Sequence, residues 1–238
     1  MFFIKFILFL CLLQSGPVCA NACSLLHTGR PPEVLRLKSL LADTKQIPVL
    51  CYHNIRSSQA AHDPSYTIST ETFRLHIKML HDSGYHTILP AQLYNYLTVG
   101  AALPPKPVMI TFDDTRLEHY SIAAPVLEQY GFKGVFFIMT VAIGKPGYMT
   151  ATQLKTLSDS GHVIGLHTWN HPDVRKLTPN EWNIQLDKPV QLLEKITGKP
   201  VQYFAYPFGA WNDIVIAELK KRGIKAAFQL SGKQSATE

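Results

Sequence analysis

The run PVMITFDD at residues 107–114 indicates the fold, because a short apolar run without polar alternation is typical of a strand buried on both faces. Similar runs recur along the chain, and stretches with helical periodicity fall between them. The other runs occupy residues 47–55, 86–90, 134–139, 162–167, 201–207 and 225–230. The chain is therefore expected to belong to the α/β class, with mostly parallel strands.

These seven strands predict an irregular (β/α) barrel with about seven parallel strands. An open doubly wound sheet is the alternative, but no glycine-rich phosphate loop follows any of the strands. In a (β/α) barrel the chemistry takes place at the C-terminal ends of the strands. The side chains that follow each run are therefore the first candidates for a functional site.

The composition fits one folded catalytic domain. The chain has 238 residues, of which 46% are hydrophobic and 17% are charged, which allows a single sizeable core and excludes a disordered or fibrous protein. The formal net charge is +6, but the basic residues are spread along the chain. This spread gives no cluster typical of a nucleic-acid partner.

The first residues predict export. Residues 1–22 combine one lysine, an apolar run too short to span a membrane comfortably, and small residues at Ala20 and Ala22, as a secretory signal peptide does. A short membrane anchor is the alternative. The expected organisation is a signal peptide at 1–22, a linker at 23–46 and the catalytic domain at 47–238. The expected location is the periplasm, the cell envelope or the medium.

The cysteines agree with export without forming a framework. Cys11 and Cys19 lie within the predicted signal peptide, so only Cys23 and Cys51 would persist, and two cysteines define no disulfide pattern. Cys23 follows the small residues directly, so a lipid on its thiol could anchor the protein to a membrane. Ordinary cleavage is an equal alternative, because Ala20 stands where a lipoprotein signal usually has an aliphatic residue. Cys51 is predicted to be a small buried hydrophobe rather than a ligand.

Two carboxylates and two imidazoles follow predicted strands. Asp113 and Asp114 end the run at 107–114, and His167 and His171 lie in HTWNH after the run at 162–167. An aspartate pair alone would more often cap a turn, and two nearby histidines alone are often ordinary surface or core residues. Together, one aspartate and two histidines make a three-ligand set that leaves room for water on a divalent metal.

A third strand end carries aromatic residues. The segment FAYPFG at residues 204–209 places Tyr206 and Phe208 around Pro207, and Gly209 suits a tight turn. Aromatic rings at a pocket rim suit sugar rings, which makes Tyr206, Pro207 and Phe208 candidate substrate-binding residues. Simple packing of the barrel explains this segment equally well.

The combination of TFDD, HTWNH and the PFG turn resembles the polysaccharide deacetylases of the NodB-homology type, carbohydrate esterase family four. The resemblance runs from about residue 47 to residue 230, and it implies the irregular barrel of that family. It also implies that Asp114, His167 and His171 bind a divalent metal, often zinc, and that Asp113 is the catalytic base. A backbone N–H near Phe208 would help to hold the oxyanion. Cobalt, nickel or iron would suit the same ligands.

Departures from the family pattern narrow the resemblance. Ala205 occupies the place where many members have an arginine, and the late Leu-x-His motif that bears the usual general acid is missing. With the early VLCYHNI strand, these features resemble the branch that deacetylates poly-β-1,6-N-acetylglucosamine in biofilm matrices, which implies that His53 is the acid. An ordinary member that lacks its C-terminal part is the alternative, and a histidine at a strand end is often only structural. Thr115 stands where a glycine commonly follows the aspartate pair in this family, so the family pattern does not predict the shape of that loop.

The function implied is metal-dependent hydrolysis of N-acetyl groups on an extracellular N-acetylglucosamine polymer, with release of acetate. The expected partner is therefore an acetylated polysaccharide. An acetyl esterase or a deacetylase that acts on peptidoglycan, chitin oligomers or xylan is the nearest alternative, because the same chemistry serves esters and amides. A non-catalytic carbohydrate-binding protein is a further alternative, although it would not need the intact set of Asp113, Asp114, His167 and His171.

Overall fold

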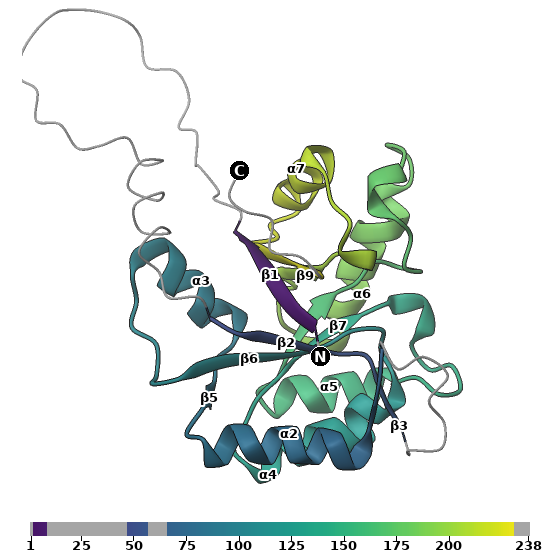
Figure 1. Ribbon diagram of the computed structural model, residues 1–238. Helices are drawn as coiled ribbons and strands as arrows, with labels where there is room; N and C mark the ends of the chain where they lie inside the picture. Colours follow the sequence, from purple (N-terminus) through teal and green to yellow (C-terminus); the bar gives the residue numbers. More distant parts are fainter. Residues whose placement is uncertain (1, 9–46, 57–65, 231–238) are drawn as a thin grey trace, which may run out of the picture.

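The computed structural model describes residues 2–8, 47–56 and 66–230 (Figure 1). Its main sheet contains all seven predicted strands, and each of them is parallel to its neighbours among the seven. They are β2 (Val49–Tyr52), β5 (His86–Thr87), β6 (Pro107–Phe112), β7 (Val135–Ile138), β8 (Val163–Leu166), β9 (Tyr203–Ala205) and β10 (Ala226–Leu230). The sheet curls into an irregular barrel with flanking helices, which confirms the predicted fold class.

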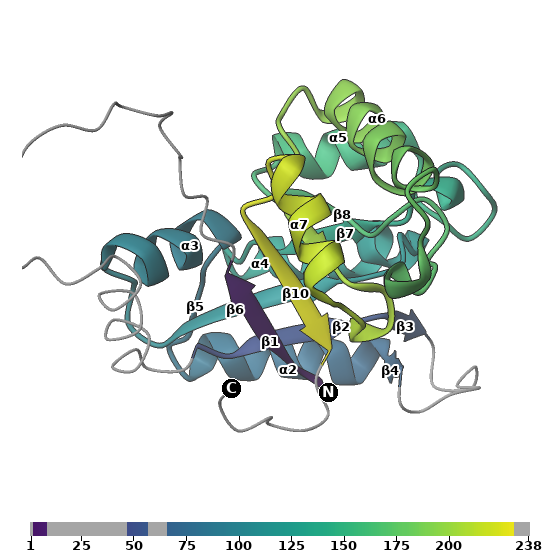
Figure 2. The same ribbon diagram turned by 90° about the horizontal axis from the view of Figure 1, so that it is seen from above.

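An eighth strand, which the sequence did not suggest, lies between β10 and β2. Strand β1 (Phe2–Leu8) runs antiparallel to β10, and its residues Phe2 and Phe3 pair with β2 (Figure 2). Because β2 also pairs with β6, β1 links the two ends of the curled sheet. Strand β1 falls within the predicted signal peptide, whose removal stays a prediction. The predicted linker at 23–46 and Cys23 lie outside the described residues.

Helices cover the outside of the barrel. They are α2 (Thr70–Asp82), α3 (Pro90–Val99), α4 (Ala124–Gln129), α5 (Ala151–Asp159), α6 (Lys188–Thr197) and α7 (Asp213–Lys221). Ser69 caps α2 by accepting the backbone N–H of Thr72, as expected for a helix start. The helical periodicity did not reveal α3, which begins at Pro90 and ends at Gly100 in the left-handed conformation. None of the described helices is long and apolar enough to cross a membrane.

Two short elements bring further residues towards the strand ends. Strands β3 (Asn54–Arg56) and β4 (Thr67–Ser69) form a separate small sheet directly after β2. A π-helical turn, η2 (His119–Ala123), precedes α4. Pro125 in α4 has no N–H for the preceding turn and its ring crowds that turn, so a wider π-helical turn there is expected.

Strand alternation divides the core into two groups. Leu50, Ile110 and Phe136 belong to the group that packs against the helices, which includes Phe73 and Leu127. The strand residues of the second group alternate with those of the first and point into the barrel, and Leu93 of α3 packs against them. The members of the second group are Val49, Cys51, Ile88, Leu93, Met109, Val135, Phe137, Tyr203, Ala205, Ala226 and Phe228. The face that carries Cys51 therefore points into the barrel.

Candidate active site

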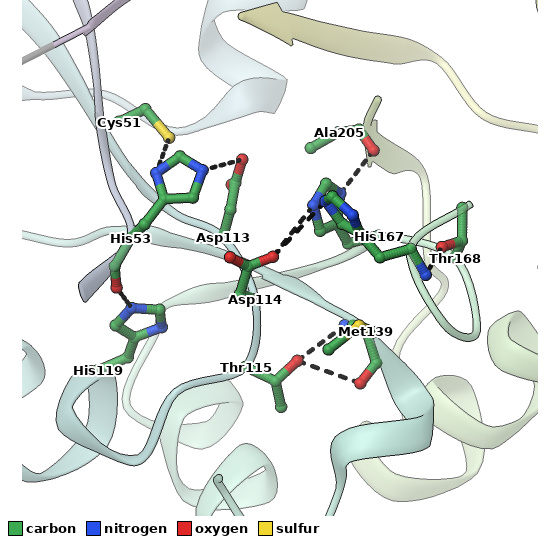
Figure 3. Close-up of polar contacts among 11 residues, drawn as sticks. Cys51, His53, Asp113, Asp114, Thr115, His119, Met139, His167, Thr168 and Ala205 are labelled. Carbon is green, nitrogen blue, oxygen red and sulfur yellow. Dashed lines mark hydrogen bonds and ion pairs between the residues drawn. The ribbon is translucent and has the colours of Figure 1, made fainter. Parts of the chain in front are cut away.

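The predicted catalytic and metal-binding residues lie close together at the carboxyl ends of the strands (Figure 3). His53 follows β2, Asp113 and Asp114 follow β6, and His167 follows β8, with His171 in the loop beyond it. Strands that are distant in sequence end at the same rim in a parallel barrel. The side chains form two groups, the Asp114 cluster and the His53 cluster.

The Asp114 cluster consists of Asp114, His167 and His171, and its side chains converge on one carboxylate oxygen. Asp114 Oδ1 lies 3.6 Å from Nε2 of His167 and 3.7 Å from Nε2 of His171. The centroids of the two imidazole rings lie 4.7 Å apart. Each of the two histidines therefore directs its Nε2 towards the same carboxylate oxygen.

Electrostatics in the Asp114 cluster favour a charged aspartate. Burial alone would raise the pKa of Asp114, but the hydrogen bond and charge of His167, with the charges of His53 and His171, hold that pKa well below its usual range. Burial and the charge of His167 lower the pKa of His171 to about 4. A negative carboxylate beside a neutral imidazole is the ionisation state that metal binding needs.

The backbone orients His167. Nδ1 of His167 lies 2.8 Å from the carbonyl oxygen of Ala205, so Nδ1 carries the proton and donates it there. When the ring is neutral, as a bound metal would require, this bond leaves the lone pair of Nε2 facing Asp114. Histidines that bind metals commonly donate their second N–H to such a carbonyl. Ala205, which stands where the resemblance leads one to expect an arginine, thus orients His167 through its backbone carbonyl.

Left-handed backbone shapes the loops of the Asp114 cluster. Asp114, Thr115, Thr168 and His171 have φ values of 79°, 63°, 67° and 64°. Such values are uncommon outside glycine and persist where surrounding contacts hold them. The hydroxyl of Thr115 accepts the N–H of Met139 at 2.8 Å and donates to its carbonyl at 3.2 Å. The side chain of Thr115 therefore supports the loop in which glycine is usual.

The His53 cluster consists of Cys51, His53 and Asp113, and it is arranged around one imidazole ring. Cys51 Sγ lies 3.7 Å from Nδ1 of His53, whereas Asp113 Oδ2 lies 3.9 Å from Nε2. Asp113 is 2% exposed, and its Oδ1 has no hydrogen-bond partner in the described structure. Burial raises the pKa of Asp113, and the charges of His167 and His53 oppose that rise.

Both clusters offer three ligand atoms within 4.8 Å of one another, but their geometries differ. In the His53 cluster, the thiol and the carboxylate face opposite nitrogens of the ring, so one ion cannot exploit both close contacts. In the Asp114 cluster, both imidazoles meet the carboxylate through Nε2. One carboxylate oxygen and two imidazole nitrogens also match the donor set of catalytic zinc sites with an open position. The Asp114 cluster is therefore the better fit for a divalent metal.

The three predicted substrate-binding residues separate in the structure. Tyr206 is 1% exposed, and Pro207 is also buried, so both support the turn from the interior and offer no surface to a sugar. Their burial follows from β9, which directs Tyr206 into the core beside Phe204. Phe208 is 66% exposed, and its ring centroid lies 4.4 Å from that of His171. Only Phe208 of the three is placed at the rim.

Sequence reasoning missed two residues that contact His53. It treated Cys51 as a passive core residue, although the spacing of two in a strand would have placed its thiol on the same face as His53. It did not single out His119 in the turn η2, whose Nε2 lies 2.5 Å from the carbonyl oxygen of His53. No motif in the sequence indicates that contact.

The irregular parallel barrel brings one carboxylate and two imidazoles together at its rim, a donor set that suits a divalent metal. Residues 100–227, just over half of the chain, match the polysaccharide deacetylase family. The chain belongs to this family, whose members are hydrolases that act on amide bonds.

Individual relatives support the family assignment. The chain is 31% identical over 178 residues to YxkH of Bacillus subtilis (strain 168), which carries the name polysaccharide deacetylase, and the match covers 75% of this chain and 62% of that protein. It is 28% identical to a poly-beta-1,6-N-acetyl-D-glucosamine N-deacetylase of Staphylococcus aureus (strain MRSA252), with 85% and 77% of the two chains covered. The solved structure of the Streptococcus pyogenes deacetylase PplD in complex with acetate superposes with a TM-score of 0.70 at 26% identity, covering 75% and 81%.

Proposed function

We propose that this chain is an exported, metal-dependent N-deacetylase that releases acetate from an N-acetylglucosamine polymer, with poly-β-1,6-N-acetylglucosamine as its substrate. The convergence of the Asp114 cluster carries this proposal. Oδ1 of Asp114 lies within 3.7 Å of Nε2 in both His167 and His171. The carbonyl oxygen of Ala205 fixes the tautomer of His167. Asp114, His167 and His171 would hold the ion, with zinc as the first choice and cobalt, nickel or iron as alternatives.

The acid and the base come from the His53 cluster. A divalent ion bound by the neighbouring cluster would polarise the acetamido carbonyl and lower the pKa of a water molecule. Asp113 would take the proton of the attacking water, because its carboxylate is buried beside the ligands and its Oδ1 has no hydrogen-bond partner in the described structure. His53 then gives its Nε2 proton to the departing nitrogen, and the C–N bond breaks to release the acetate.

The PFG turn, at residues 207–209, lies beside His171. A backbone N–H at Phe208 would stabilise the negative charge on the acetyl oxygen, an effect worth roughly 3 to 4 kcal/mol per donor in measured systems. The exposed ring of Phe208, beside His171, offers an apolar face on which a sugar ring can stack. Tyr206 and Pro207 would hold this turn in place from below.

The choice of polymer rests on two observations. The first is the match over most of both chains to the Staphylococcus aureus protein, whose name gives poly-beta-1,6-N-acetyl-D-glucosamine as its substrate. The second is the position of His53, which follows β2 and thus reaches the site from a strand that precedes the aspartates in the sequence. Export follows from the predicted signal at 1–22, and lipid attachment at Cys23 remains a further proposal.

Acetate release from a panel of polymers tests the function. The panel contains β-1,6-linked N-acetylglucosamine oligomers, chitin oligomers, peptidoglycan and acetylated xylan, each with the zinc-loaded enzyme, an excess of chelator and Asp113→Asn. We expect the fastest release from the β-1,6-linked oligomers and loss of release with chelator or with the variant. Release from acetylated xylan alone would identify an esterase. Binding without release from any polymer would identify a carbohydrate-binding protein, and release that persists in chelator would exclude the metal mechanism.

A further inference from the structure

Cys51 is a buried nucleophilic group that the proposed mechanism does not use. It is 3% exposed and lies on β2, two residues before His53. Residues two apart in an extended chain point to the same side, so the thiol and the imidazole both face into the barrel. Their contact is direct, because Sγ lies 3.7 Å from Nδ1, within hydrogen-bonding reach for sulfur (Figure 3).

The thiol of Cys51 is held in its neutral form. Burial, followed by the nearby charge of Asp113, raises the pKa of Cys51 well above its ordinary value. A neutral thiol sulfur is a weak donor and a weak acceptor of hydrogen bonds. Cys51 is therefore able to orient a ring nitrogen without adding a charge beside it.

His119 fixes the main chain of His53 from the other side. It is fully buried in the turn η2, and burial lowers its pKa to about 4, so the ring is neutral near pH 7. Its Nε2 donates to the carbonyl oxygen of His53 at 2.5 Å, which makes Nδ1 the unprotonated nitrogen. His53 is thus held through its backbone by His119 and through its ring by Cys51.

The direction of the His53 ring sets the path of its proton. Nε2 faces Asp113, with 3.9 Å between that nitrogen and Oδ2, and it is the nitrogen that borders the reacting centre. When the Nε2–H bond breaks, its proton forms a new N–H bond on the leaving nitrogen, and the electron pair stays on the ring. The neutral ring that remains then carries its proton on Nδ1, opposite Cys51.

We propose that Cys51 is a positioning residue for His53, whose sulfur accepts the Nδ1–H of the ring and thereby directs Nε2 towards the leaving nitrogen. This inference rests on the proposed role of His53 as the acid. A carboxylate in the place of the thiol would stabilise the protonated ring by its charge and make it a weaker acid. A neutral sulfur fixes the same tautomer without that charge.

Kinetics of three variants test the positioning role. Cys51→Ala removes the acceptor, Cys51→Ser keeps an acceptor, and Val49→Ala removes a comparable buried side chain from the same strand without touching His53. With the zinc-loaded enzymes, we expect Cys51→Ala to lower kcat roughly tenfold with little change in KM or zinc content. Cys51→Ser should stay within about threefold of the parent. Equal losses in Cys51→Ala and Val49→Ala would show that only core packing was disturbed and would overturn the proposal.

The tautomer of His53 can be read without any substrate. The measurement is nitrogen NMR of the isotope-labelled, zinc-loaded protein. The ring nitrogens of His53 are assigned as the signals that are missing from the spectrum of His53→Gln. We expect neutral His53 to carry its proton on Nδ1 in the parent protein and to shift towards the Nε2–H form in Cys51→Ala. An Nε2–H ring in the parent would refute the positioning role. This readout stays valid even if no polymer in the panel releases acetate, so failure of the proposed function is distinguishable from failure of this inference.

Discussion

The Asp114 cluster and the His53 cluster use similar side chains in different ways. In the Asp114 cluster, Nε2 of each of two imidazoles faces the same carboxylate oxygen, at 3.6 and 3.7 Å. In the His53 cluster, one imidazole lies between a thiol and a carboxylate, which face its two nitrogens separately. Convergence on one point suits the binding of an ion, whereas contacts on both sides of a ring suit proton transfer. Adjacent residues in sequence, Asp113 and Asp114, therefore take different roles.

The largest expected effect comes from exchanging each aspartate for asparagine. Asp113→Asn should lower kcat by roughly two to four orders of magnitude while zinc stays bound, because only the base is lost. Asp114→Asn should release zinc, because a neutral amide is a poorer ligand than a carboxylate. Zinc content after dialysis and acetate release measure the two effects. The exposed His86, exchanged for alanine, is the control, and equal zinc loss in both aspartate variants would contradict the division between the clusters.

His53→Gln tests the other half of the comparison. We expect about a hundredfold lower kcat with unchanged zinc content, and loss of the basic limb of the pH–rate profile, because a general acid has been removed. His81→Gln, a change at a half-exposed histidine on α2, is the matched control and should leave both quantities unchanged. Full activity in His53→Gln would mean that the acid comes from elsewhere in the protein.

The sequence predicted the strands well, because strands buried on both faces produce continuous apolar runs such as residues 107–112. It also indicated Asp114, His167 and His171, because parallel strands end at one rim. It failed for β1, whose residues carry the composition of an export signal, and for α3, which has mixed apolar and polar residues without a clear stripe.

Burial around the site was harder to predict from the sequence. Tyr206 belongs to an aromatic segment that looks like a rim, but the alternation of β9 turns its ring into the core. The contact of Cys51 with His53 depends on side-chain direction, and the contact of His119 with His53 depends on a π-helical turn. No sequence motif indicates either feature.

A smaller effect, on the pH dependence of stability, is expected from His162. This residue precedes β8, whereas His167 follows β8 at the site. Burial, with the charge of Lys133, lowers the pKa of His162 to about 4, so the folded state keeps this ring neutral while the unfolded chain binds a proton near pH 6.5. Stability is therefore complete above about pH 6.5 and is lost as the pH falls towards 4. Allowing for the partly exposed Glu128 beside it, we expect His162 to account for about 1 to 2 kcal/mol of this loss.

Chemical unfolding of the metal-free protein at pH 7.5 and pH 5.0 measures the contribution of His162. His162→Gln should lose less unfolding free energy than the parent between the two pH values. The same change at the exposed His86 should follow the parent curve. Parallel pH dependences for His162→Gln and the parent would show that the buried ring does not control acid stability.

The smallest expected effect concerns Thr115, which supports the loop of the Asp114 cluster. Thr115 is fully buried at φ 63°, and its hydroxyl binds both the N–H and the carbonyl of Met139. Thr115→Gly removes about 1 kcal/mol of left-handed strain together with a hydrogen bond of similar value, so its unfolding free energy should stay close to that of the parent. Thr115→Ala keeps the strain and leaves the N–H of Met139 without its partner, so it should be less stable than Thr115→Gly by about 1 kcal/mol. If alanine is instead as stable as glycine at this position, the left-handed backbone at residue 115 carries no strain.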